Sequence, residues 1–147
     1  KKMSVLLLGL LISLPFFLTS AQDELPVEFM PYDVLIDTGE QSLTAWQIEL
    51  RYDRKQVAIV GLEGGDLPTG RPPHYDSRGL QAGRIIIADF TTEKGDLPEG
   101  RFRLARLHLQ VTGDLVPEFD LKLLAAAQPG GERIPATLSI EKMQEEE

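Results

Sequence analysis

The stretch A45-W-Q-I-E-L-R-Y-D53 decides the fold class of this chain. Apolar side chains fall on every second position and polar ones lie between them; the apolar set is Trp46, Ile48, Leu50 and Tyr52. The side chains of a strand repeat with a period of two, whereas a helix would scatter these residues around its circumference. The stretch is therefore predicted to be a β-strand that buries one face.

The same alternation recurs along the chain and predicts at least seven strands, at 32–37, 45–53, 57–62, 84–90, 105–112, 119–123 and 134–141. Clusters of Gly, Pro, Asp and Thr separate most of these segments. A helix over 121–128 is the one rival, because its alanines suit a helix, but Pro117 and Pro129 confine it. The predicted fold class is all-β, an antiparallel β-sandwich of about seven to nine strands.

Two details refine the strand prediction. The alternation slips by one position between Phe102 and Ala105, which predicts a β-bulge or a strand that crosses between the sheets. Three consecutive isoleucines at 85–87 are typical of a strand covered on both faces.

The first 21 residues have the pattern of a secretory signal peptide. Lys1 and Lys2 form a positive start, Val5–Leu18 is an apolar run, and small residues precede a predicted cut after Ala21. The run is shorter than the roughly 20 residues of a spanning helix, although an uncleaved anchor is the alternative. We expect a secreted or periplasmic protein with a single domain over 22–147, which has no membrane span after cleavage and ends in a short acidic tail.

The composition excludes several classes of function. The 147 residues contain 23 Asp and Glu against 15 Lys and Arg, so the net charge is −8, and loss of the leader with its two lysines brings it to −10. This acidity argues against binding to nucleic acid or to an anionic membrane. The chain has no cysteine, which removes disulfides, thiol catalysis and cysteine metal sites.

Two loops repeat one phrase. The first loop is the long one, Gly64–Gly83, and the second is Thr91–Gly100. Residues 65–71 of the first and residues 95–101, at the end of the second, are identical at six of seven positions. We interpret the phrase as reused turn chemistry, in which Asp binds backbone amides and Gly supplies positive φ. The alternatives are a paired ligand-binding lip and a calcium site at Asp66 or Asp96. A short helical turn is expected around Ser77.

No motif points to catalysis or to a cofactor. Two histidines, His74 and His108, lack the spacing of a zinc site, and His108 falls on the polar face of a strand. His74, Asp76 and Ser77 are neighbours within one Pro-rich loop, which lacks the separate elements that assemble a catalytic triad. The chain has no phosphate-binding glycine loop and no EF-hand calcium loop.

The only basic cluster in the sequence is Arg101, Arg103 and Arg106. Because the chain around these arginines is acidic, we expect them to balance carboxylates and not to bind a polyanion.

The strands together resemble a known family. The stretches V34-L-I-D-T-G39, L43-T-A-W-Q-I-E-L-R-Y-D53 and V57-A-I-V-G-L-E-G-G65 are similar to the N-terminal half of cohesin domains, including the corner at Tyr52 and Asp53. G83-R-I-I-I-A88 and L104-A-R-L-H-L-Q-V111 resemble later strands of that family. The resemblance covers about Tyr32–Gly113 and implies a β-sandwich of the superfamily that also includes certain cellulose-binding modules.

The resemblance implies an exported, non-catalytic binding or adhesion module that recognises a protein partner, such as a dockerin-like one, on a sheet face or through the long loop. Direct polysaccharide binding is the alternative, and a small secreted hydrolase is a third. Trp46 and Tyr52 are predicted to be buried, so Tyr75 is the best exposed ring, which is little for stacking on sugars.

Protein recognition is therefore favoured, with Arg71, His74 and Tyr75 as candidate binding residues because Tyr and Arg often dominate interfaces. Replacement of Arg71 and Tyr75 by Ala is expected to abolish capture of the partner while the melting temperature stays nearly unchanged.

Overall fold

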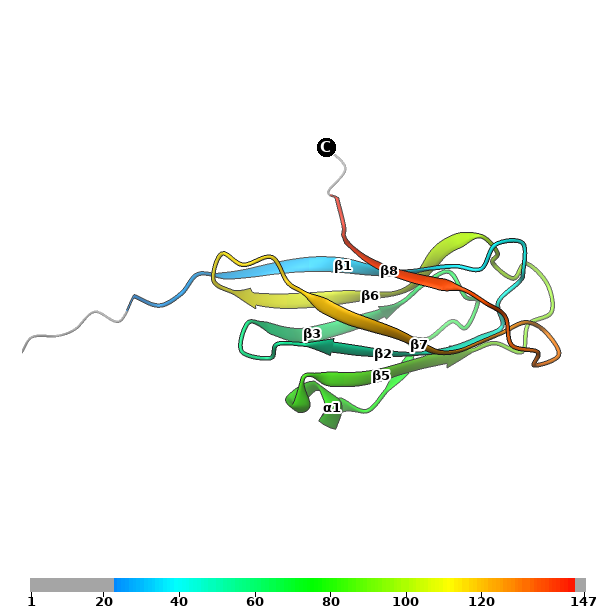
Figure 1. The fold of residues 1–147 in the computed structure, drawn as a ribbon, viewed down its shortest axis with the longest axis horizontal. Coiled ribbons are helices and arrows are strands. Elements are labelled where there is room, and N and C mark those ends of the chain that lie inside the picture. The colour runs from blue at the N-terminus through cyan, green and yellow to red at the C-terminus, as the bar shows by residue number, and fades with distance from the viewer. Residues whose placement is uncertain (1–22, 145–147) are drawn as a thin grey trace, which may run out of the picture.

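The computed structural model describes residues 23–144 (Figure 1). Its one helix is α1 (Ser77–Ala82), and its strands are β1 (Val27–Asp37), β2 (Ala45–Tyr52), β3 (Val57–Gly64), β4 (His74–Tyr75), β5 (Arg84–Phe90), β6 (Arg101–Thr112), β7 (Phe119–Ala127) and β8 (Thr137–Lys142). The predicted signal peptide and the acidic residues 145–147 lie outside the described residues.

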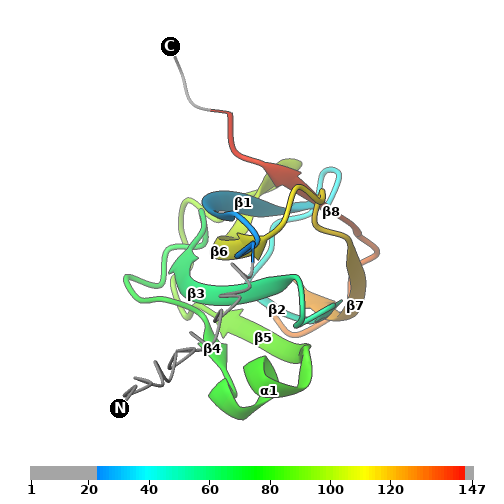
Figure 2. The same cartoon turned by 90° about the vertical axis from the view of Figure 1, so that its left-hand side faces the viewer.

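The strands form two four-stranded sheets that face each other, as Figure 2 shows end-on. One sheet has the order β3-β6-β1-β8, the other has the order β4-β5-β2-β7, and all neighbouring strands are antiparallel. The prediction of an all-β antiparallel sandwich is therefore confirmed. The segment 121–128 belongs largely to β7 and is extended, so the rival helix there is excluded.

The core lies between the sheets and consists of the alternating apolar side chains. Trp46 is 2% exposed, Ile48 and Leu50 are fully buried, and Tyr52 is 9% exposed, as the opening stretch predicts. Phe119 packs its ring against Tyr52 at 6.5 Å between centroids. Each large buried side chain of this kind contributes about 2 kcal/mol through the hydrophobic effect.

The predicted irregularity in β6 is a β-bulge. Val34 of β1 pairs with Ala105, but the next residue, Leu35, pairs with Arg103, so Leu104 is left over. Leu104 and Ala105 are consecutive and both buried. A bulge allows this because the extra residue shifts the alternation by one position, so the apolar side chains before and after it both face the core.

Several boundaries and faces differ from the sequence prediction. β6 begins at Arg101 and not at 105, because the bulge interrupts its alternation, β7 continues to Ala127 and not 123, and the two-residue strand β4 was not predicted. Ile86 is only half-buried, because the outer face of the β4-β5-β2-β7 sheet carries no further layer among residues 23–144. β1 begins at Val27 and not at Tyr32, since Pro31 is tolerated where its nitrogen points away from β6 and leaves the β1–β6 ladder intact. β8 begins only at Thr137, although Ile134 is buried ahead of it.

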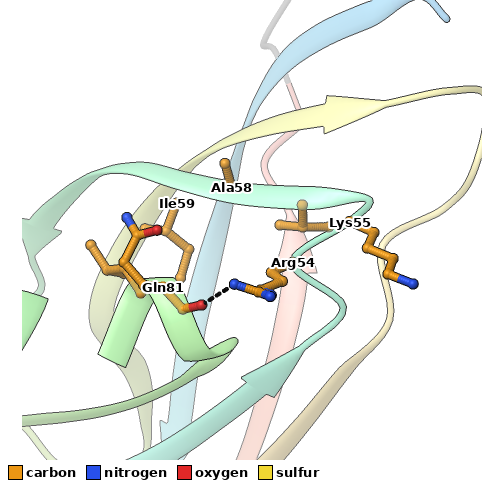
Figure 3. A pocket seen from close by; sticks show the side chains of 7 residues that line it. Arg54, Lys55, Ala58, Ile59 and Gln81 are labelled. Atoms are coloured by element: carbon orange, nitrogen blue, oxygen red, sulfur yellow. Dashed lines mark hydrogen bonds between the residues drawn. The ribbon is translucent and has the colours of Figure 1, made fainter. Parts of the chain in front are cut away.

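The helical turn expected around Ser77 is α1. The Asp76 side chain caps it by accepting a hydrogen bond from the Arg78 N–H at 3.0 Å, and Gly83 ends it at φ 67°. The Arg54 guanidinium donates to the Gln81 carbonyl at 2.7 Å, which fixes the β2–β3 turn to the helix (Figure 3). A hollow of about 390 Å³ lies between α1 and β3 at this point.

Candidate binding face

The outer face of the β4-β5-β2-β7 sheet carries an apolar hollow of about 350 Å³. Four alanines from three strands line it: Ala45, Ala88, Ala125 and Ala127. The strand register assembles them, because Gln47 of β2 pairs with Ala88 on one side and Ala125 on the other. Small side chains on neighbouring strands leave a depression, and His74 and Phe90 stand at its border.

Phe90 is held in place by the long loop. Its ring is 53% exposed, and the Arg71 guanidinium lies over it at 5.3 Å from the ring centroid. Arg71 Nη1 also lies 3.0 Å from a carboxylate oxygen of Asp89, whose side chain is 3% exposed. The loop residue Arg71 therefore fixes an exposed aromatic ring to the rim of the hollow.

The structure places the three predicted binding residues differently from one another. His74 pairs with Ala88 and lines the hollow, and Arg71 reaches Phe90 next to it. Tyr75 is 42% exposed, but it follows His74 in β4, so its side chain points to the opposite side of that strand. Two of the three predicted residues thus meet at one face, and Tyr75 lies apart from them.

The other half of this face is charged. Glu49 is 7% exposed and forms ion pairs with Arg51, at 2.6 Å, and with Arg84. Arg51 and Arg84 are direct cross-strand neighbours, so the carboxylate neutralises two adjacent cations. The pKa of Glu49 lies below its ordinary value mainly because Arg51 donates a hydrogen bond to the carboxylate, and the hydrogen bond from Arg84 lowers the pKa further.

The outer face of the other sheet is also charged. Arg106 donates two hydrogen bonds to Asp33, at 2.7 and 2.9 Å, and these bonds hold the pKa of the Asp33 carboxyl below its ordinary value. Arg103 lies 3.9 Å from the same carboxylate, and Arg101 pairs with Glu141. The prediction that the arginine cluster balances carboxylates is confirmed.

The repeated phrase serves two different turns. Gly70 and Gly100 both have positive φ, at 66° and 72°, as expected from turn chemistry. Asp66 accepts a hydrogen bond from the Arg103 N–H at 2.9 Å, whereas Asp96 itself adopts a positive φ of 55°. Within residues 23–144 no group of three or more His, Cys, Asp or Glu side chains is arranged to hold a metal ion.

The loop residues next to His74 are used for structure. Asp76 accepts hydrogen bonds from the Arg78 backbone and guanidinium, and the guanidinium bond is the main cause of its lowered pKa. Ser77 is the first residue of α1. These contacts give Asp76 a capping role at the start of α1.

Sequence reasoning missed Phe90 and the four alanines. They come from strands that are far apart along the chain, and only the sheet order brings them together. One signal was available: Phe90 is the last residue of β5 and falls on the face opposite Ile85 and Ile87, so its ring should be exposed.

Comparisons with known proteins support the fold assignment. No protein-family model and no curated protein sequence matches the chain. Solved structures do match. One comes from a type I cohesin–dockerin complex of Clostridium thermocellum, with 13% identity, a TM-score of 0.59, and coverage of 74% of this chain and 82% of that one.

Two further structures give the same result. The seventh ScaB type I cohesin of Pseudobacteroides cellulosolvens matches with 11% identity, a TM-score of 0.53, and coverage of 72% and 73%. A structure of the third cohesin ScaC with the ScaB dockerin, from Acetivibrio cellulolyticus, matches with 12% identity, a TM-score of 0.53, and coverage of 74% and 80%.

The fold class is therefore an antiparallel β-sandwich, and within that class the fold is similar to that of cohesin domains. The resemblance noted in the sequence is confirmed at the level of the fold. Within the described residues, no helix has both the length and the apolar character to cross a membrane.

Proposed function

We propose that this chain is an exported, non-catalytic binding module that recognises a protein partner through the outer face of its β4-β5-β2-β7 sheet. The observation that carries the proposal is the alanine-lined hollow bordered by His74 and Phe90. An exposed apolar surface with an anchored aromatic ring and a charged surround is typical of a protein interface. The signal peptide at 1–21, with cleavage after Ala21, is the proposed basis of export.

A dockerin-like protein is the partner class that we test first, because two of the similar structures are described as cohesin–dockerin complexes. The surface itself favours a partner that inserts an apolar side chain into the hollow. Charged groups of such a partner would then meet Glu49, Arg51 and Arg84 on the other half of the face.

Binding to polysaccharide receives less support from the geometry. Trp46 is buried, and the exposed rings of Phe90 and Tyr75 point to opposite faces of the β4-β5-β2-β7 sheet. A flat platform of several rings suited to sugar faces is therefore not formed by these residues.

The proposal is tested with one blocking variant and one matched control. Ala88→Arg puts a long side chain into the alanine-lined hollow, whereas Ala58→Arg puts the same side chain at an exposed position of β3 in the other sheet, beside the hollow next to α1. The protein is titrated by calorimetry with the dockerin of the Clostridium thermocellum complex, and with proteins that it captures from an exported fraction after these are identified and purified.

Binding to a purified protein that Ala88→Arg weakens at least about tenfold, and that Ala58→Arg leaves unchanged, supports the proposal. Equal effects of both variants would reject this face. Retention on cellulose or chitin that Ala88→Arg abolishes would replace the protein partner by a polysaccharide.

A further inference from the structure

A second apolar surface lies at one end of the molecule, away from the hollow. Its side chains are between 50% and 80% exposed and are Leu25, Val27, Phe29, Leu115 and Val116. The connection between β6 and β7 lies beside the start of β1 (Figures 1 and 2), where Gly113 donates its N–H to the Pro26 carbonyl at 2.8 Å. Exposed apolar side chains that lie together on a surface often mark a contact with a partner.

The start of β1 also has an unpaired edge. β1 pairs with β6 from Val27 to Asp37, but it pairs with β8 only from Tyr32 onward. The second edge of 27–30 therefore faces no strand among residues 23–144. Such an edge is a template for another strand.

The hydrogen bonds on either side fix which groups point to this edge. Within a strand, the N–H and C=O of one residue point to the same edge, and the edge alternates from residue to residue. The Pro26 carbonyl bonds toward β6, and the Pro31 carbonyl accepts from the Met143 N–H at 3.0 Å on the β8 side. The backbone groups of Val27 and Phe29 therefore point to the free edge.

Space for a further strand is present next to these groups. A hollow of about 440 Å³ lies between the Glu28–Pro31 segment of β1 and the Lys142–Gln144 segment after β8. Neighbouring strands lie about 4.8 Å apart, so a strand placed at this edge would occupy the hollow. Its outer side chains would cover the Phe29 ring.

The charges around the edge select the partner. Acidic residues flank the apolar ones in the sequence: Asp23, Glu24, Asp114 and Glu118. The nearby Lys142 is engaged with Glu28 at 3.8 Å. A second copy of the chain would bring acid against acid, whereas a segment with basic flanks would be attracted.

We propose that the free edge of β1 is a second binding site, which takes an extended apolar segment with basic flanks from another protein as an added strand. The backbone of Val27 and Phe29 supplies the hydrogen bonds, and the exposed side chains supply the apolar contact. This site is separate from the alanine-lined hollow and does not depend on the function proposed for it.

The test uses three peptides against the purified protein, with binding followed by calorimetry. The first is acetyl-Lys-Lys-Val-Thr-Val-Thr-Val-Lys-amide, the second is the same peptide N-methylated at alternate residues, and the third has Glu in place of Lys. We expect the first to bind, and each of the others to bind at least about tenfold more weakly. Equal binding of the N-methylated peptide would overturn strand addition, and equal binding of the Glu peptide would overturn the charge argument.

Variants of the protein locate the site. Phe29→Pro removes the edge-facing N–H without a loss in the β1–β6 ladder, and Phe29→Thr keeps that N–H but removes the ring. Both variants should weaken binding of the first peptide, and Phe29→Pro should do so more strongly. Phe90→Thr and Ala88→Arg should leave the affinity for this peptide unchanged. Buried Trp46 fluorescence confirms that each variant is folded.

Two results would reject the site: no binding of the first peptide to the unaltered protein, and a concentration-dependent dimer that Phe29→Pro dissolves, which would make a second copy the occupant.

Discussion

Arg71 Nη1 lies 3.0 Å from Oδ1 of Asp89, a carboxylate that is almost completely buried at the end of β5. The Asp89 carboxylate also accepts a hydrogen bond from the Phe90 N–H at 2.9 Å. One guanidinium, that of Arg71, thus both neutralises the buried Asp89 carboxylate and packs over the Phe90 ring at the border of the hollow.

Arg71→Ala should destabilise the protein by about 2 kcal/mol, because it leaves a buried carboxylate without its cation; the partial exposure of Arg71 keeps the loss below that of a fully buried pair. This revises the expectation that Arg71 can be removed at no cost to the melting temperature. Urea unfolding measures the loss, and Arg133→Ala, at an exposed residue, is the control. A double-mutant cycle with Asp89→Asn that shows no coupling would contradict the role given to the pair.

Trp46→Ala should lower the free energy of unfolding by at least about 3 kcal/mol, because the side chain is in the core. Tyr75→Ala, at a residue that is 42% exposed, should lower it by less than about 1 kcal/mol. Chemical denaturation measures both variants. The only tryptophan is also a probe of folding: its emission should resist quenching by iodide in the native protein and shift to the red on unfolding. Emission that iodide quenches in the native protein would contradict its burial.

The pH dependence of stability should depend on Asp33 and Glu49. Their pKa values are lowered in the folded protein from 3.8 and 4.5, so their stabilising contributions are present above these values and are lost as the pH falls through the folded pKa. Asp33→Asn should lower the urea midpoint at pH 7, and its difference from the unaltered protein should shrink toward pH 2. Glu40→Gln, at an exposed carboxylate, should keep the normal profile. A difference that is equally large at both pH values would argue against the ion pair.

The repeated phrase offers a matched pair of glycines. A Cβ at Gly65 would lie 1.9 Å from the Arg103 carbonyl oxygen, whereas a Cβ at Gly95 would meet nothing within 4 Å. Gly65→Ala should therefore cost about 2 kcal/mol through forced backbone movement, and Gly95→Ala should change stability by less than about 0.5 kcal/mol. Thermal unfolding compares the two variants. Equal melting temperatures would show that the two turns are equivalent after all.

Much of the fold could be predicted because alternation reports directly on burial. The bulge at Leu104 is visible as a slip in the pattern, and the resemblance to cohesins follows from the same buried positions. The first residues of β1 escaped prediction because Phe29 faces solvent and Pro31 suggests a break, although its nitrogen points away from β6 and so removes no hydrogen bond from that ladder.

The site was less accessible to sequence reasoning. Arg71 and His74 were singled out for their residue types, and the structure places both beside the hollow. Phe90 and Ala125 come from strands that flank β2 on opposite sides. The spacing of these residues along the chain does not predict that arrangement, because the order of strands in a sheet is set by the packing of the whole domain.

The position of β1 has a consequence for how the chain folds. This first strand lies between β6 and β8, so Val34 needs Ala105 on one side and Ile140 on the other. Contacts so distant in sequence make folding slow and dependent on nearly the whole chain. A fragment that stops before β8 leaves the second edge of β1, from Tyr32 to Asp37, without its partner strand, so the pairing of β1 is completed only after the rest of the described sandwich has been synthesised.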